Sequence, residues 1–285
     1  MRRIIGGLLM ATLLLAGCST LRFAYNQAPD LAYWWIDGYA DLDNDQSKQL
    51  RESLTHWFRW HRSSELPLYA GMLARGESQV QEPATPTQAC RWYDEIMARI
   101  DAASEHAVPA MAALARTITA EQVAHIERRY DKKNREFADD YLQDTPAERL
   151  KAAVKVAQER AEILYGDLDA AQRQLLTRSI AQSPFDPERW LAERKRRQQD
   201  VLRLLRRLLS EPTTLAQTQD EIRAVIARMR VSPDEAYRDY QRRLLQHNCT
   251  LAAQLHNVSS TAQRRAAAKK LRGWQEDLRA LAPSS

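Results

Sequence analysis

The chain has 285 residues and a formal net charge of +5, and only 8 of its residues are glycine. Few glycines together with abundant Ala, Leu, Arg, Gln and Glu favour helices and argue against a β-sandwich or a β-barrel. The charge is uneven, because residues 185–285 carry 20 Lys and Arg against 12 Asp and Glu, which leaves residues 18–184 acidic.

The first 17 residues are organised like a secretory signal peptide. Arg2 and Arg3 precede an apolar run over residues 4–15, which is shorter than the roughly 20 residues of a membrane-spanning helix. The run ends in Leu15-Ala16-Gly17-Cys18, which resembles the bacterial lipobox, in which the cysteine is acylated and becomes the new N-terminus. We therefore expect a cleaved signal peptide over residues 1–17 and a lipid on Cys18.

A lipid anchor would place the mature chain in the bacterial cell envelope. Two or three acyl chains hold a protein on a membrane almost permanently. Ser19 follows the cysteine, and the sorting rule of enterobacterial lipoproteins favours the outer membrane, facing the periplasm, when that residue is not Asp. The expected partners are then the membrane, envelope proteins, and anionic lipid or glycan, but no nucleic acid.

Residues 18–40 form an aromatic segment directly after the proposed anchor, and residues 41–285 are expected to form a single helical domain. Trp and Tyr favour the boundary between membrane and water, so this segment could rest on the bilayer. The alternative is that it packs as a lid over the helical body. Its aromatic side chains are Phe23, Tyr25, Tyr33, Trp34, Trp35 and Tyr39.

The helix predicted from Asp43 to about Leu66 carries the most distinctive polar pair. Trp57, His61 and Glu65 share one helical face. Such a pair can act as a base and its orienting group or contribute two metal ligands, and it would be the basis of an envelope hydrolase. Neither a nucleophile nor further ligands are visible in the sequence, so a structural polar tie is the alternative.

A loop is predicted over residues 76–86, because this stretch has Gly, Ser, Glu, Pro and Thr but no apolar face. The cysteines beyond it are Cys90 and Cys249, an even pair for an oxidising compartment. They could form a disulfide between an early and a late helix, or remain two buried free thiols.

Repeated capping patterns mark the starts of further helices. Thr85-Pro86, Thr145-Pro146 and Ser232-Pro233 are each followed by a Glu or Gln able to close a capping box, and Asp186-Pro187 begins similarly. With the apolar stripes behind them, these signals predict an all-α bundle of about eight to ten helices.

A second pattern has an apolar residue, Thr or Asp, two residues and Gln, beginning at Leu42, Ile118 and Leu168. It resembles the Leu-Thr-x-x-Gln motif of small periplasmic helical proteins of the Spy and CpxP type. Capping alone also explains it, since Thr or Asp caps the helix and Gln reaches back.

The helix predicted after Pro187 is strongly basic. Its charges could offer an edge to an anionic envelope polymer, or they could form a solvated face balanced by acidic neighbours. The residues concerned are Arg194, Lys195, Arg196, Arg197, Arg203, Arg206 and Arg207.

Several motifs in order resemble an uncharacterised proteobacterial lipoprotein family with a domain of unknown function. They are the lipobox and the segments 23–26, 34–39, 42–46 and 60–69. The resemblance implies a helical envelope lipoprotein and transfers no activity. We expect a non-enzymatic binding or chaperone-like module, with a binder of anionic polymers and a His61/Glu65 hydrolase as alternatives. Catalytic residues are not identifiable, and neither a cofactor nor a metal site is predicted.

Overall fold

The structure is a computed structural model that describes residues 20–143 and 145–283, and it is helical, as the composition predicts. Within these residues every regular element is a helix, so the all-α prediction is confirmed. Helix α4, a π-helical turn and helix α5 follow one another without a break and are counted here as one helix. On this count the described residues form 11 helices, more than the eight to ten expected. The predicted signal peptide and Cys18 lie outside the described residues.

The helix boundaries follow the capping signals closely. In chain order the elements are α2 (Thr20–Asn26), α3 (Ala28–Ala40), α4 (Asn44–Trp60), the π-helical turn (His61–Glu65), α5 (Leu66–Gln79), α6 (Pro86–Ala115), α7 (Ala120–Tyr141), α8 (Pro146–Tyr165), α9 (Ala170–Ala181), α10 (Pro187–Ser210), α11 (Leu215–Arg230), α12 (Glu235–Asn257) and α13 (Thr261–Leu281).

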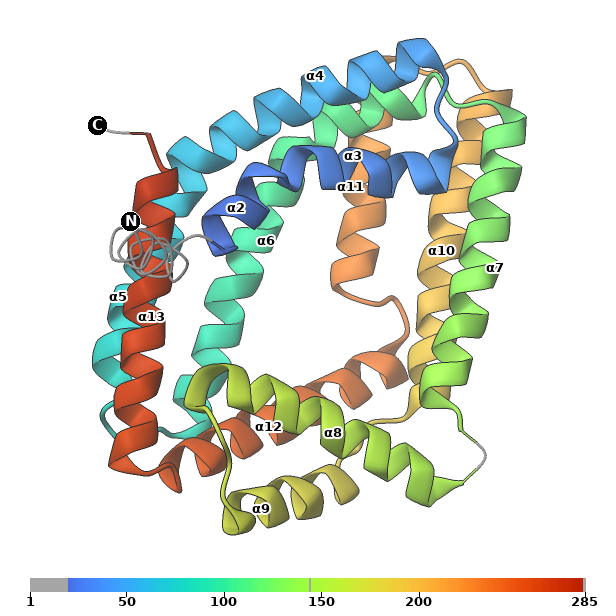
Figure 1. Ribbon diagram of the computed structural model, residues 1–285. Helices are drawn as coiled ribbons and strands as arrows, with labels where there is room; N and C mark the ends of the chain where they lie inside the picture. The colour runs from blue at the N-terminus through green and yellow to red at the C-terminus, as the bar shows by residue number, and fades with distance from the viewer. Residues whose placement is uncertain (1–19, 144, 284–285) are drawn as a thin grey trace, which may run out of the picture.

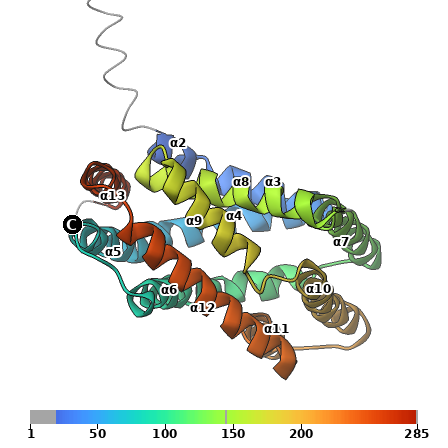
Figure 2. The same ribbon diagram turned by 90° about the horizontal axis from the view of Figure 1, so that it is seen from below.

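The helices are arranged as the sides of a frame (Figure 1). Helix α4 spans one side, α5 and α13 pack along each other on the next, and α7 and α10 form the opposite side. Helix α12 closes the frame together with α8 and α9, while α6 packs against both α11 and α12. Figure 2 shows α2, α3 and α8 on one face and α11 and α12 on the other.

This arrangement divides the buried apolar side chains into separate clusters at the junctions between helices. One cluster joins α6 to α11, another joins α8, α9 and α12, and the largest joins α3 and α7 to α10. The largest cluster is built from Ala40, Ile118, Val123, Ile126, Leu202 and Leu205. The buried apolar residues of the described chain thus form several small cores at these junctions.

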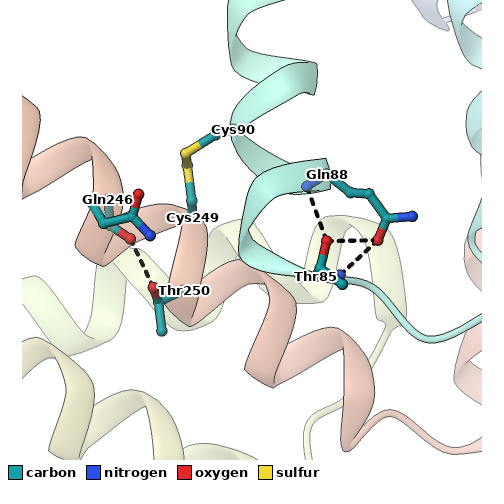
Figure 3. The surroundings of a disulfide bond; sticks show 6 residues. All are labelled: Thr85, Gln88, Cys90, Gln246, Cys249 and Thr250. Atoms are coloured by element: carbon teal, nitrogen blue, oxygen red, sulfur yellow. Dashed lines mark hydrogen bonds between the residues drawn. A yellow bond between two sulfur atoms is a disulfide. The ribbon is translucent and has the colours of Figure 1, made fainter.

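The motif with Gln at its fifth position does begin helices. Asp43, Thr119 and Asp169 are N-caps, and each forms a complete capping box with the Gln three residues later. Thr85 forms the same box with Gln88 at the start of α6 (Figure 3). Local cap chemistry therefore set these boundaries.

The same glutamines also join helices that are distant in sequence. Gln46 and Gln122 exchange two amide hydrogen bonds, Nε2 to Oε1, of 3.1 and 2.6 Å, where α4 and α7 begin. Gln172 and Gln263 do the same at 2.7 and 3.0 Å where α9 and α13 begin. These two junctions lie at opposite corners of the frame (Figure 1). The glutamines of these capping boxes therefore both cap their own helices and hold distant helices together.

Three local predictions differ from the structure. The N-cap of α12 is Asp234 and not Ser232, which is buried and donates to Glu193 Oε2 at 3.1 Å instead. Helix α5 runs to Gln79, so the loop predicted over residues 76–86 is confined to residues 80–85. The helix expected to end near Leu66 continues through Pro67, because a π-helical turn widens the backbone directly before the proline.

Candidate functional site

The widened turn before α5 positions the predicted pair His61 and Glu65. The backbone N–H of Leu66 donates to the His61 carbonyl, which is the five-residue spacing of a π-helix. A regular α-helix would bring the ring of Pro67 against the carbonyl four residues earlier, and the wider turn relieves that clash. Both His61 and Glu65 are buried as a result.

His61 lies in an aromatic stack and not against Glu65. Its ring is stacked between Trp57, at a centroid distance of 4.8 Å, and Tyr25, at 5.8 Å. Burial lowers the pKa of His61, and burial raises the pKa of Tyr25 to about 12. Both groups are therefore neutral near pH 7, and the Tyr25 hydroxyl and His61 Nδ1 share a hydrogen bond of 2.7 Å.

Glu65 has a different partner on another helix. Its Oε1 lies 3.5 Å from Arg99 Nη1 of α6, while its Oε2 is buried without a hydrogen-bond partner. The pKa of Tyr69 is raised, first by burial and then by the charge of Glu65. The two members of the pair do not bond to each other, and their contacts with Tyr25 and Arg99 connect the π-helical turn to α2 and α6.

The arrangement offers no support for the hydrolase alternative. His61 and Glu65 line neither of the two large cavities described below. Within residues 20–143 and 145–283, no three His, Cys, Asp or Glu side chains are grouped to hold a metal ion. Neither side chain therefore opens into either of the two large cavities.

The first large cavity, cavity A, has a volume of about 820 Å³ and lies inside the frame. Its walls come from α3, α4, α6, α7, α10 and α11, with Tyr237 of α12, and most of its lining side chains are apolar or aromatic. The aromatic lining residues are Trp35, Tyr39, Trp57, Phe58, Tyr130, Trp190 and Tyr237. Its size and composition are those of sites that bind small apolar ligands.

The second large cavity, cavity B, has a volume of about 940 Å³ and lies between α5, α6, α8, α12 and α13. Several of its polar side chains are hydrogen-bonded within the protein. Gln79 accepts a hydrogen bond from Trp92, and His256 contacts the Tyr165 hydroxyl at 2.9 Å and the Glu82 carbonyl at 2.7 Å. Cavity A is the better candidate because one polar group in its wall lacks a partner, as shown below.

Most of the predicted basic face is neutralised by carboxylates of the same protein. Arg196 bonds to Glu193 at 2.8 Å and to Asp200 at 2.5 Å, both of which are buried. Arg197 bonds to Glu193, Arg203 to Asp200, Arg206 to Glu127, and Arg207 to Glu221. Five of the seven predicted basic residues are therefore paired, since acidic residues lie three or four positions away or on α7 and α11.

The two remaining basic residues differ from each other. Lys195 is exposed to solvent, whereas Arg194 is half-buried in the wall of cavity A. The guanidinium carbon of Arg194 lies 5.8 Å from the Phe137 ring centroid, and its Nε is buried without an acceptor. Sequence alone could not separate Arg194 from its basic neighbours, because only the rotation of α10 against α7 distinguishes them.

The N-terminal aromatic segment has one side packed against the helical body and another side exposed to solvent. Tyr33 is buried, and Tyr25 bonds to His61, so one side of the segment packs on the body. Trp34 and Trp35 are 63% and 66% exposed, with Leu31 exposed on the same side of α3. Among the described residues, no helix is long and apolar enough to cross a membrane.

The structure brings the two predicted cysteines together. Cys90 of α6 and Cys249 of α12 form a disulfide with an S–S distance of 2.07 Å and a Cα–Cα distance of 5.3 Å (Figure 3). The bridge joins residues 159 positions apart. It fastens the contact between α6 and α12 at one edge of cavity B.

The fold and cavity A together define an all-α protein with a large apolar site. Residues 38–216 match the profile of a family of unknown function, DUF6279. Because the match covers more than half of the chain, this protein belongs to that family. Comparisons with curated proteins and with solved structures return no match. The likeness to Spy- and CpxP-type proteins stays a prediction.

Proposed function

We propose that this protein is a lipid-anchored lipoprotein of the bacterial envelope that works without catalysis, as a binding module for apolar chains. Cavity A carries the proposal. An aromatic and aliphatic lining of this volume favours the transfer of an apolar chain out of water. The buried pair His61 and Glu65, by contrast, faces neither large cavity.

The proposed location rests on the lipobox and on the surface that follows it. Cys18 would carry the lipid, and the short helix α2 is followed by α3, on which Leu31 and Trp34 are exposed. Aromatic side chains of this kind favour the membrane–water boundary. We therefore place the protein on the periplasmic side of the outer membrane, with this side of α3 toward the bilayer.

The anchor is tested by growing cells that express the full chain with an alkyne-bearing palmitate analogue. We expect the label to appear on the wild-type chain and to disappear in the Cys18→Ala variant, which would also retain residues 1–17. Equal labelling of the wild-type and Cys18→Ala chains, or no labelling of either, would contradict the proposed lipid anchor.

Binding is tested with the full chain in phosphatidylcholine vesicles and a photoreactive long-chain alcohol, which is apolar and uncharged. After irradiation and digestion, labelled peptides should contain Trp57, Met111 or Leu114 from the cavity wall. Ala110→Trp should reduce this labelling, because it fills space in the same wall.

The matched control places the same large side chain outside the cavity. Ala120→Trp, at the exposed start of α7, should leave the labelling unchanged. Labelling confined to Leu31 and Trp34, which are exposed on α3 but do not line cavity A, would show that the cavity takes no apolar chain. Cavity-wall labelling that Ala110→Trp does not reduce would also contradict the proposal.

A further inference from the structure

The wall that α10 gives to cavity A changes character along the helix. Residues at helical spacing face the cavity, beginning with Trp190 and ending with Leu205. Val201 and Leu205 make the later part of this stripe apolar, whereas Arg194 and Arg197 make the earlier part cationic. The cavity is therefore apolar over most of its lining and has charged groups concentrated on one helix.

The acidic residue in that wall is already neutralised. Glu193 accepts hydrogen bonds from Arg196 at 2.8 Å, Arg197 at 2.9 Å and Ser232 at 3.1 Å. Burial opposes its ionisation, but these donors hold the pKa of Glu193 below its ordinary value. Arg197 is hydrogen-bonded to this carboxylate, so its guanidinium is not the group that would bind a ligand.

Positive charge exceeds negative charge around this part of α10. The two buried carboxylates, Glu193 and Asp200, are contacted by four guanidinium groups, and Arg194 adds a fifth nearby. The four contacting residues are Arg196, Arg197, Arg203 and Arg228. An anion entering the cavity is therefore attracted to this end.

Arg194 is the group that this anion would meet. Among the described residues it has no carboxylate partner, and its buried Nε–H has no acceptor. Leaving such a donor unpaired destabilises a protein, and because Arg194 also lines cavity A, a carboxylate there would lie beside an arginine that no protein carboxylate neutralises. The aromatic ring of Phe137 covers the guanidinium and excludes water from that side.

We infer that cavity A binds a long-chain fatty acid, with its alkyl chain along the aromatic walls and its carboxylate against Arg194. This inference rests on the proposed function. A peptide segment fits less well, because every residue would bring an amide donor and acceptor that the apolar walls cannot pair. A fatty acid carries its charge at one end of the molecule, and the charged residues that line the cavity all lie on α10.

The test compares two photoreactive probes of equal chain length, a fatty acid and its alcohol, on the full chain in phosphatidylcholine vesicles. We expect the fatty acid to label the cavity wall at a lower concentration than the alcohol. Arg194→Gln should weaken fatty-acid labelling about tenfold or more, as the loss of a charge-assisted hydrogen bond predicts. Labelling by the alcohol should not change, which also shows that the variant is folded.

Lys195→Gln is the matched control, because it removes one positive charge from the neighbouring, exposed position. It should leave both probes unaffected. If both probes label the cavity equally and Arg194→Gln changes neither, the fatty-acid inference is overturned while the proposed function stands. If neither probe labels the cavity, both fail. Displacement by a lysophospholipid at lower concentration than by unlabelled oleate would overturn the choice of a carboxylate.

Discussion

Removing the bridge between Cys90 and Cys249 gives the sharpest test of the fold. The perturbation is the double substitution Cys90→Ala and Cys249→Ala in the full chain. The bridge closes a loop of 159 residues, and the loop-entropy description assigns such a closure about 5 kcal/mol of stability. Cys249 is also buried, so its truncation leaves a small void that adds about 1 kcal/mol at most.

A loss of this size is large beside the 5–15 kcal/mol by which most domains are stable. We expect the double variant to unfold at a clearly lower urea concentration than the oxidised wild type. The dependence of unfolding free energy on urea should also steepen, because an uncrosslinked chain exposes more surface when it unfolds. Circular dichroism at equilibrium measures both quantities.

Two controls separate the bridge from the side chains. The single variant Cys249→Ala should match the double variant, and the reduced wild type should be more stable than both only by the void, about 1 kcal/mol at most, since all three lack the same bond. Alkylation before reduction should find neither thiol free in the oxidised protein. Free thiols in that sample, or a double variant within about 1 kcal/mol of wild type, would refute the loop-closure argument.

Three further predictions concern other contacts. Glu193→Gln should destabilise the protein by about 3 kcal/mol, because its arginines lose a buried partner. Since the folded-state pKa of Glu193 is lowered, its stabilisation is complete above its unfolded pKa and declines as the pH falls toward the folded value, which urea titrations at pH 7 and pH 3 would measure. Gln122→Leu should destabilise by about 1–3 kcal/mol in the same assay, because it breaks a buried amide pair. The exposed Gln88→Leu, which breaks only a capping box, should have the smaller effect. Substituting Leu31 and Trp34 with Ser should weaken vesicle binding of a chain that begins at Ser19, without lowering stability, and equal sedimentation with vesicles would contradict the membrane-facing assignment.

The helix starts were predictable because capping is a local interaction. Asp43 and its Gln46 lie three residues apart, so the sequence alone brings cap and partner together. The second role of Gln46 was not predictable in this way. Its partner Gln122 is 76 residues away, and only the packing of α4 near α7 makes them meet.

The contacts of the polar pair in the π-helical turn, by contrast, were not predicted correctly from local sequence. The spacing of His61 and Glu65 suggested mutual contact, but their neighbours Tyr25 and Arg99 come from other helices. The widened turn before Pro67 changed the direction of both side chains. A pattern of residues on an ideal α-helix cannot anticipate this change, although the proline itself was a signal of irregular backbone.

The basic helix shows how identical side chains acquire different roles. Arg194, Arg196 and Arg197 are close neighbours in sequence, and helical spacing predicts that acidic residues three or four positions away will pair with some of them. Glu193 takes Arg196 and Arg197, but Arg194 is one residue beyond Glu193 and therefore points away from it. This direction brings Arg194 close to Phe137 and to cavity A, and among the described residues no carboxylate forms an ion pair with it there. A cation held over an aromatic ring at the wall of an apolar space selects a ligand with one anionic end.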